Sequence, residues 1–381
     1  MTDRLMMIPG PTILPPEVRE ALGKPSIYHR GGEFAALLAE CVEGLRSLLG
    51  TAKMPVLLTC SGTGGVEAMI VNTLSPGDRV LAVDSGKFGD RMGRIAAAYG
   101  ASVTTLPLEP GRAAEPEQVE KALGQEPYTA LLFVYNETST GVKQPVHELA
   151  RVAIDRGVMP LVDCVSAVAG MPVAVDEWGL AGAAGGSQKA LMLPPGLAVV
   201  VLGEKGLSAA AGAKMPRFYF DLPKAISAQE KGQTPYTPNV SLILALQAAL
   251  RLIFAEGLAT FQQRHRRLAS ACRAAARAAG LDLLVAAESE ASDVVTAIRS
   301  PAGIDSSLLV KAVAANHDIV ISGGQDQLKG RIFRIGHMGA AQLSDLLRTW
   351  EAVATELSAL GTPCSPDECV SAAEAAYQTA E

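Results

Sequence analysis

The sequence predicts an α/β protein: a large domain built on a mainly parallel sheet, followed by a smaller α+β domain. The 381 residues, 49% of them hydrophobic, are enough to form one large and one small core. Short apolar runs alternate with helical stretches up to about residue 255, which is typical of a parallel sheet covered by helices on both faces. After that residue the pattern changes to long helices with a few separate strands.

Short, apolar segments rich in β-branched residues are predicted as the strands of the large domain. They are 55–60, 79–84, 102–108, 130–135, 159–163 and 197–202. Helices are expected between most of them, for example over 88–100 and 146–157. Because ligands bind at the carboxyl ends of parallel strands, we expect the residues after these strands to share one rim. Those residues are 61–65, 84–89, 136–141 and 163–166.

We expect the large domain to span 21–255, after an N-terminal segment of residues 1–20, and the small domain to span 256–362. In the small domain, the helices are predicted over about 256–279, 306–317 and 340–360, and the strands near 293–300 and 332–336. Residues 231–241 are polar and rich in proline, which predicts an exposed loop. Residues 363–381 are predicted to be a polar tail.

Composition argues against several kinds of partner. The net charge is −6 and no long basic run occurs, so we do not expect nucleic acid to bind. The first residues lack the apolar core of a signal peptide, and no apolar run is long enough for a bilayer, so a cytoplasmic protein is expected. The six cysteines are scattered without a CxxC pair, so we expect no metal site.

The segment Ser-Gly-Thr-Gly-Gly at 61–65 follows a predicted strand and opens a predicted helix. Main-chain N–H groups at such a turn, together with the helix N-terminus, form an anion site that suits a phosphate. The hydroxyl group of Thr63 adds a donor. The segment is not a Walker loop, and Glu67 occupies the third position of a G-x-G-x-x-G pattern. An ordinary tight turn therefore stays open as an alternative.

Lys189 lies among small and apolar residues, within Gly185 to Gly196. The pKa of a lysine falls readily on burial, and the residue then becomes an amine nucleophile; a solvated surface lysine is the alternative.

Asp163 ends an apolar strand, where a carboxylate needs a partner. A protonated ring nitrogen of pyridoxal phosphate is one candidate partner, and a helix cap or an internal salt bridge is the other.

Three more side chains are candidates for the same rim. Phe88 offers a ring that stacks on a planar cofactor, or else packs in the core. Thr138 lies at a strand end within reach of a ring hydroxyl, or else belongs to a turn. Arg334 lies between apolar residues in a strand of the second domain. A half-buried guanidinium needs a bidentate anion, which is either a substrate carboxylate or an internal Asp or Glu.

Together these groups form the set that pyridoxal phosphate uses to act on an amino acid. The chain resembles the class V aminotransferases of fold type I, and within them the alanine/serine–glyoxylate (or pyruvate) group. The resemblance runs from 9–18 to 334–339, and the block Ser-Gln-Lys-Ala-Leu-Met-Leu-Pro-Pro-Gly at 187–196 is its most specific part. It implies a large domain with a seven-stranded sheet, and a homodimer with a shared active site.

The resemblance also assigns roles to residues. It implies that Lys189 forms the Schiff base with pyridoxal phosphate, that Asp163 binds the pyridine nitrogen and that Arg334 binds the substrate carboxylate. Phe88 then stacks on the ring and Thr138 lies near the ring oxygen. The residues implied at the phosphate are Thr63, Gly64, Gly65 and Gln188, together with Gln233, Tyr236 and Thr237 from a loop of the neighbouring subunit. The N-terminal segment 1–20 is expected at the mouth of the site.

The activity that the resemblance implies is a ping-pong transfer of an amino group. Alanine or serine is the expected donor, glyoxylate or pyruvate is the expected acceptor, and the freed Lys189 is the general base. A donor of the 2-aminoethylphosphonate or pyridoxamine type is the main alternative. A cysteine desulfurase is less well supported, because it needs a reactive cysteine that the residues before Arg334 do not supply. A phosphate-binding module without catalysis is the remaining alternative.

Overall fold

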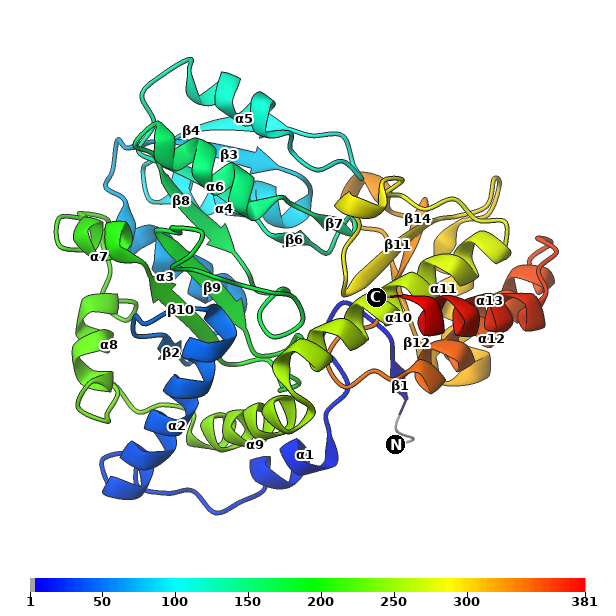
Figure 1. Ribbon diagram of the computed structural model, residues 1–381, viewed down its shortest axis with the longest axis horizontal. Coiled ribbons are helices and arrows are strands. Elements are labelled where there is room, and N and C mark those ends of the chain that lie inside the picture. The colour runs from blue at the N-terminus through cyan, green and yellow to red at the C-terminus, as the bar shows by residue number, and fades with distance from the viewer. Residues whose placement is uncertain (1–3, 381) are drawn as a thin grey trace.

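The structure is a computed structural model that describes residues 4–380. Its central feature is a seven-stranded sheet in the order β2-β10-β9-β8-β5-β3-β4 (Figure 1). The strands are β2 (Val56–Leu58), β3 (Arg79–Asp84), β4 (Ser102–Pro107), β5 (Ala130–Val134), β8 (Met159–Asp163), β9 (Gly182–Gly186) and β10 (Ala198–Leu202). The predicted α/β class is confirmed.

Side chains of the central strands alternate between two apolar cores. In β5, Leu131 and Phe133 face one core, whereas Ala130, Leu132 and Val134 face the other. Such burial on both faces explains why these strands are continuously apolar. The covering helices are α1 (Pro16–Leu22), α2 (Gly32–Leu49), α3 (Gly62–Thr73), α4 (Lys87–Ala98), α5 (Pro116–Leu123), α6 (Val146–Asp155), α7 (Glu204–Ala210), α8 (Leu222–Gln229) and α9 (Val240–Glu256).

Two features of the sheet were not specified by the sequence. Strand β10 is antiparallel to both of its neighbours, β2 and β9, which agrees with the predicted mainly parallel sheet, but the sequence did not identify this strand as the antiparallel one. Strand β9 was not predicted, because its sequence Gly-Ala-Ala-Gly-Gly has no β-branched residue. Its glycines allow close packing instead. A Cβ atom on Gly182 would lie 2.9 Å from Sδ of Met69, which belongs to α3.

A second, smaller sheet lies to one side of the central sheet and its helices (Figure 1). Its three strands are in the order β11-β14-β13. Its strands are β11 (Val295–Arg299), β13 (Ser322–Gly323) and β14 (Ile332–Gly336). The helices around it are α10 (Leu258–Ala278), α11 (Ser306–His317), α12 (Leu343–Ala359) and α13 (Pro366–Thr379). Two short 3-10 helices, η1 (Glu288–Glu290) and η2 (Asp326–Leu328), lie in its loops. The predicted domain boundaries stay predictions.

The N-terminal segment crosses from the small sheet toward the large one. Strand β1 (Leu5–Met6) pairs in parallel with β12 (Ile319–Val320), and the chain then reaches α1, which packs against α9. A further short hairpin, β6 (Asn136–Glu137) with β7 (Val142–Lys143), extends the turn after β5. This turn brings Thr138 toward the small sheet.

Residues 366–379 form helix α13 instead of a polar tail. Ser365 caps the helix by accepting a hydrogen bond from the main-chain N–H of Glu368, which is a common N-cap arrangement. Cys369 and Ala373 are fully buried because α13 packs against α10. The polar composition of this segment hid these two small buried residues.

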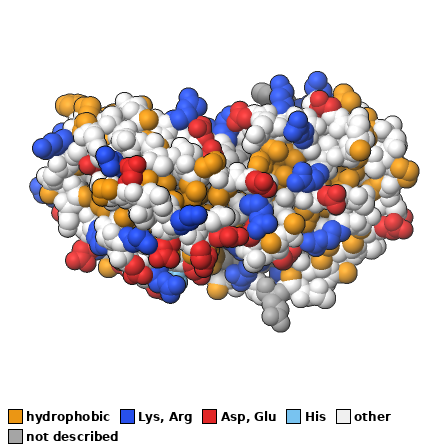
Figure 2. Space-filling view, turned by 90° about the horizontal axis from the view of Figure 1, so that it is seen from above, with side chains coloured by type: hydrophobic (Ala, Val, Ile, Leu, Met, Phe, Trp, Pro, Cys, Tyr) orange, Lys and Arg blue, Asp and Glu red, His pale blue; other side chains and the backbone are white. Residues whose placement is uncertain are grey.

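Charged side chains of both signs are interspersed over the face that Figure 2 shows. Within residues 4–380, no single helix combines the length and the apolar composition of a membrane span. Helices α9 and α10 meet that criterion only as a pair, and the pair is bent by 84°.

Candidate active site

A cavity of about 140 Å³ opens at the carboxyl edge of the central sheet. It is lined by Gly62, Thr63, Val66, Phe88, Arg91, Met92, Asp163, Val165, Gln188 and Lys189. The residues come from the start of α3, the start of α4, the end of β8 and the segment after β9. The sheet therefore brings five of the predicted site residues together around one space: Thr63, Phe88, Asp163, Gln188 and Lys189.

The start of α3 forms one wall of this cavity. Ser61 is the N-cap residue, but its side chain makes no capping hydrogen bond, and the first turn contains no acidic residue. The first N–H groups of a helix lack partners within the helix and carry the positive end of its dipole. Gly64 and Gly65 keep this turn compact, since a Cβ atom on Gly64 would lie 2.9 Å from Sγ of Cys60. This wall can bind an anion.

Asp163 lies on the cavity floor at the end of β8 and is 7% exposed. Its carboxylate accepts a hydrogen bond of 2.8 Å from the N–H of Val165. Within residues 4–380, no cation lies within ion-pair distance of it. Burial raises the pKa of Asp163 to about 6. Such a carboxylate is ready to accept a bond from a protonated nitrogen.

Lys189 faces Asp163 across the cavity and is 9% exposed. Burial lowers the pKa of its amine to about 8, although the negative charge of Asp163 acts in the opposite direction. The amine donates a hydrogen bond to the carbonyl oxygen of Pro9 at 2.5 Å. A desolvated lysine of this kind is suited to attack a carbonyl carbon.

Arg334 lies in the middle of β14 and is 5% exposed. Its Nε and Nη2 atoms donate to the carbonyl oxygen of Gly323, and Nη1 donates to that of Thr138 at 2.7 Å. No Asp or Glu among the described residues forms an ion pair with it, so the alternative of an internal salt bridge is not what this structure contains. Arg334 is not among the residues that line the cavity itself, although its positive charge contributes, after burial, to the lowered pKa of Lys189.

Gln233, Tyr236 and Thr237 do not line this cavity. They belong to an irregular loop between α8 and α9, in which Thr237 is exposed. Arg30 holds the loop by donating to Oε1 of Gln233 at 3.0 Å and to the carbonyl oxygen of Thr234 at 2.7 Å. In the single chain, these three predicted residues are therefore separated from Lys189.

Sequence reasoning singled out neither of two further contributors to the site, although Gly10 belongs to the segment 1–20 that was expected at its mouth. Arg91 lines the cavity, donates to Oγ1 of Thr63 at 3.2 Å and lies over the Phe88 ring at 4.7 Å from the ring centre. Arg91 follows Phe88 by three residues, and residues at this spacing are neighbours on the surface of a helix. This spacing is the signal in the sequence that would have pointed to Arg91. Gly10 approaches Lys189 so closely that a Cβ atom there would lie 2.9 Å from Cδ of the lysine. Nothing in the local sequence predicts this long-range contact.

The residues of the cavity fit pyridoxal phosphate. The uncapped α3 terminus can receive the phosphate, and Asp163 can accept a hydrogen bond from a protonated ring nitrogen. Because Thr63 accepts a hydrogen bond from Arg91, its own hydroxyl proton remains available to an anion. The lysine amine and the Phe88 ring supply the covalent and stacking contacts that such a cofactor requires.

Of the three relatives of known sequence described next, two are named as aminotransferases and one as a hydrogenase subunit. The chain is 41% identical to the "Soluble hydrogenase, small subunit" of Synechococcus sp., and the match covers 100% of both chains. It is 38% identical to the L-aspartate–glyoxylate aminotransferase of Paracoccus denitrificans, covering 98% of this chain and 96% of that one. It is 35% identical to the serine–glyoxylate aminotransferase of Methylorubrum extorquens, and the match covers 97% of this chain and 94% of that one.

Solved structures show the same architecture. The ureidoglycine–glyoxylate aminotransferase of Bacillus subtilis superposes with a TM-score of 0.93 at 28% identity, covering 100% of this chain and 99% of that one. The pyridoxamine–pyruvate aminotransferase of Mesorhizobium loti superposes with a TM-score of 0.93 at 28% identity, and the match covers 98% of this chain and 97% of that one. The predicted fold type I architecture is thereby confirmed.

The family Aminotransferase class-V matches residues 11–344, a range that includes the whole cavity and Arg334. The chain therefore belongs to the class V aminotransferases and is a pyridoxal-phosphate-dependent enzyme.

Proposed function

We propose that this aminotransferase moves an amino group from alanine or serine to glyoxylate or pyruvate by a ping-pong mechanism. The observation that carries the proposal is the buried Arg334 guanidinium, which has only carbonyl oxygens as partners in this structure. A buried cation without an ion pair is costly, and the carboxylate shared by α-amino acids and α-keto acids would satisfy it. The glyoxylate named for several relatives supports the acceptor.

We infer that Lys189 is the catalytic amine. Pyridoxal phosphate supplies an aldehyde and a ring that takes up electrons when it is bound. Burial lowers the pKa of Lys189 to about 8, so a fraction of the amine is neutral near pH 7. In that form it would hold the cofactor at its aldehyde carbon and, when free, would accept a proton from the substrate Cα. The carbonyl group of Pro9 holds the amine at the edge of the cavity.

The remaining predicted residues would bind and orient. Asp163 would hold a proton on the ring nitrogen, because a buried carboxylate is stabilised by a neighbouring cation. Phe88 would stack on the ring, and Thr138 would lie beside the ring oxygen. Gln188 and the α3 turn with Thr63, Gly64 and Gly65 would bind the phosphate.

We propose in addition that the enzyme is a homodimer whose loop around Gln233, Tyr236 and Thr237 completes the phosphate site of the other subunit. The loop lies outside its own cavity and is partly exposed, which supports this proposal. Subunit complementation tests it. A mixed dimer of Lys189→Ala and Thr237→Ala chains should regain one intact site, and a mixture as inactive as either parent would contradict a shared site. The cytoplasmic location stays a prediction.

Absorbance titration tests the proposed substrates. The visible band of the cofactor-loaded enzyme should disappear with alanine or serine and return with glyoxylate or pyruvate. Aspartate, 2-aminoethylphosphonate and pyridoxamine serve as competing donors in the same experiment. A band that responds only to one of these three would replace the proposed donor.

A further inference from the structure

The carboxylate of Glu137 is a polar group that the proposed mechanism does not use. Its side chain is 0% exposed, in the turn after β5. Its two oxygens accept four hydrogen bonds. Oε2 accepts from the N–H groups of Phe88 and Gly89 at 2.9 and 3.0 Å, and Oε1 accepts from the N–H and hydroxyl groups of Ser139 at 3.0 and 2.5 Å. Nothing in the sequence pattern distinguished this residue.

On one side, Glu137 fixes the start of α4. Gly86, the N-cap residue, has no side chain to cap this helix, so the Glu137 carboxylate takes two of its free N–H groups from a distant segment. The approach depends on Gly86, which has a φ of +150°, because a Cβ atom there would lie 2.9 Å from Cδ of Glu137. The carboxylate thereby sets the position of the Phe88 main chain.

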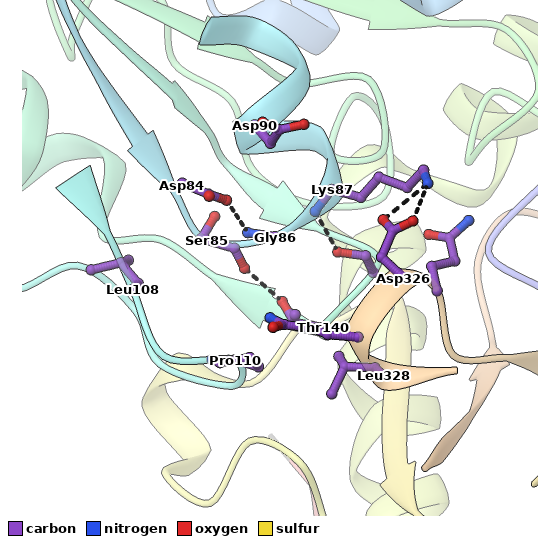
Figure 3. A pocket seen from close by; sticks show the side chains of 13 residues that line it. Asp84, Ser85, Gly86, Lys87, Asp90, Leu108, Pro110, Thr140, Asp326 and Leu328 are labelled. Atoms are coloured by element: carbon purple, nitrogen blue, oxygen red, sulfur yellow. Dashed lines mark hydrogen bonds and ion pairs between the residues drawn. The ribbon is translucent and has the colours of Figure 1, made fainter. Parts of the chain in front are cut away.

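On the other side, Glu137 fixes the turn that holds Arg334. Thr138 lies between Glu137 and Ser139, and its carbonyl oxygen accepts from Nη1 of Arg334 at 2.7 Å. The hydroxyl group of Ser139 also accepts from the N–H of Lys87, so three hydrogen bonds join the turn to the start of α4. Figure 3 shows Gly86 and Lys87 at the start of α4, with Thr140 of the turn, around a neighbouring cavity of about 330 Å³, where Lys87 also pairs with Asp326 at 3.0 Å.

We propose that Glu137 is a positioning residue of the active site: its carboxylate holds the ring-stacking Phe88 and the carboxylate-binding Arg334 in one fixed arrangement. The inference rests on the proposed function, which gives those two residues their roles. It assigns to Glu137 no contact with substrate or cofactor.

A carboxylate is required by the number of donors. Four donors converge on two oxygens, and an ionised carboxylate offers about four lone-pair sites. A glutamine of the same shape has only one side-chain oxygen, and its NH₂ group cannot accept a hydrogen bond. That NH₂ group would face either the two main-chain N–H groups of α4 or the N–H of Ser139, which would then lose their acceptor. Burial lowers the pKa of Arg334 to about 10, and the nearby carboxylate of Glu137 acts against this shift.

The experiment compares Glu137→Gln and Glu137→Asp with Glu356→Gln as the matched control. Glu356 is 7% exposed and accepts from Asn316 and His317 in the small domain, so its variant loses a buried carboxylate outside the site. Three quantities are measured: the dissociation constant of pyridoxal phosphate, the circular dichroism of its bound chromophore, and KM and kcat for the amino acid.

In Glu137→Gln, we expect the cofactor dissociation constant and KM each to rise about tenfold, with a weaker dichroic band, because a buried donor loses its acceptor. Glu137→Asp keeps the charge and all acceptors and should recover part of each loss. Glu356→Gln should match the wild type in all three. Wild-type values in Glu137→Gln, or equal changes in Glu356→Gln, would overturn the proposal.

A milder variant covers the case in which Glu137→Gln does not fold. Ser139→Ala removes one of the four donors and should shift the same quantities in the same direction by a smaller factor; a folded Ser139→Ala without any shift would also overturn the inference. Failure of the proposed function is distinct, because it appears in the wild type as a lack of response to alanine and serine. The cofactor dissociation constant and the dichroic band still test Glu137 in that case.

Discussion

The side-chain amine of Lys189 donates to the carbonyl oxygen of Pro9 at 2.5 Å, although the two residues are 180 positions apart in the chain. The contact is reinforced by Thr12, whose hydroxyl group donates to the carbonyl oxygen of Lys189 at 2.9 Å. The N-terminal segment is therefore part of the wall around the amine. Its position explains why Gly10, which lies between these contacts, has no room for a side chain.

Substitution of Gly10 by alanine tests this wall. The φ of Gly10 is +122°, and a Cβ atom would lie 2.8 Å from the carbonyl oxygen of Gln188. We expect the free energy of unfolding to fall by about 1–3 kcal/mol and the cofactor to bind more weakly. Gly32→Ala is the control, since a Cβ atom there meets nothing within 4 Å. Thermal unfolding and cofactor titration measure both effects, and equal behaviour of the two variants would contradict the prediction.

Substitution of Lys189 by alanine tests the catalytic amine. We expect the visible band of the bound cofactor to disappear and the transamination rate to fall by a factor of about 10²–10⁴, the usual contribution of a general base. Cofactor should still bind through the phosphate wall, so ultrafiltration separates loss of chemistry from loss of binding. Full activity in this variant would mean that another amine performs the reaction.

Several residues that line the cavity were candidates because they lie at strand ends. Asp163 ends β8 and Phe88 follows β3, and parallel strands bring such positions to one edge. Thr63 was identified for the same reason, through the glycine turn that precedes α3. Lys189 follows β9, which was not predicted, so it was identified from its apolar surroundings and from the family resemblance. Local patterns were sufficient wherever the sheet itself places the side chain.

The parts that escaped prediction depend on packing between distant segments. Strand β9 contains only glycine and alanine, and this composition resembles a loop. Its glycines face close neighbours, since a Cβ atom on Gly182 would meet Met69 of α3 and one on Gly185 would meet Val199 of β10. The buried acceptor role of Glu137 depends on the N–H groups of Phe88 and Gly89, about 50 residues away in the chain. Helix α13 was missed because only Cys369 and Ala373 of it are buried.

The stability of the cofactor-free protein should depend on Asp163. Burial raises the pKa of this carboxyl to about 6 from an ordinary value of 3.8. Between these values the folded state binds the proton more tightly than the unfolded state does, so the stability that this group contributes is present below about pH 4 and is lost as pH rises through 6. At neutral pH, the ionised and unpaired Asp163 therefore destabilises the cofactor-free fold.

Asp163→Asn removes that ionised group but keeps an oxygen for the N–H of Val165. We expect the cofactor-free variant to have a higher melting temperature than the cofactor-free wild type at pH 7.5, with a difference that closes toward pH 4.5. With cofactor present the order should reverse, because the variant lacks the charge that holds the ring proton. Thermal unfolding at both pH values measures this, and a lower melting temperature of the cofactor-free variant at pH 7.5 would contradict the prediction.

Arg334→Ala should raise KM for the amino acid while the enzyme still binds its cofactor. Loss of a charged, bidentate contact costs about 2–4 kcal/mol, which corresponds to a rise of roughly 30- to 900-fold in KM. The variant also leaves the carbonyl oxygens of Gly323 and Thr138 without their donor, so some loss of stability is expected as well. Arg217→Ala provides the matched control, because within residues 4–380 Arg217 donates only to carbonyl oxygens, those of Val71, Ala210, Ala213 and Met215. We expect that control to lose stability without a change in KM. Steady-state kinetics on both variants decide the point, and an unchanged KM in Arg334→Ala would assign the substrate carboxylate to a different cation.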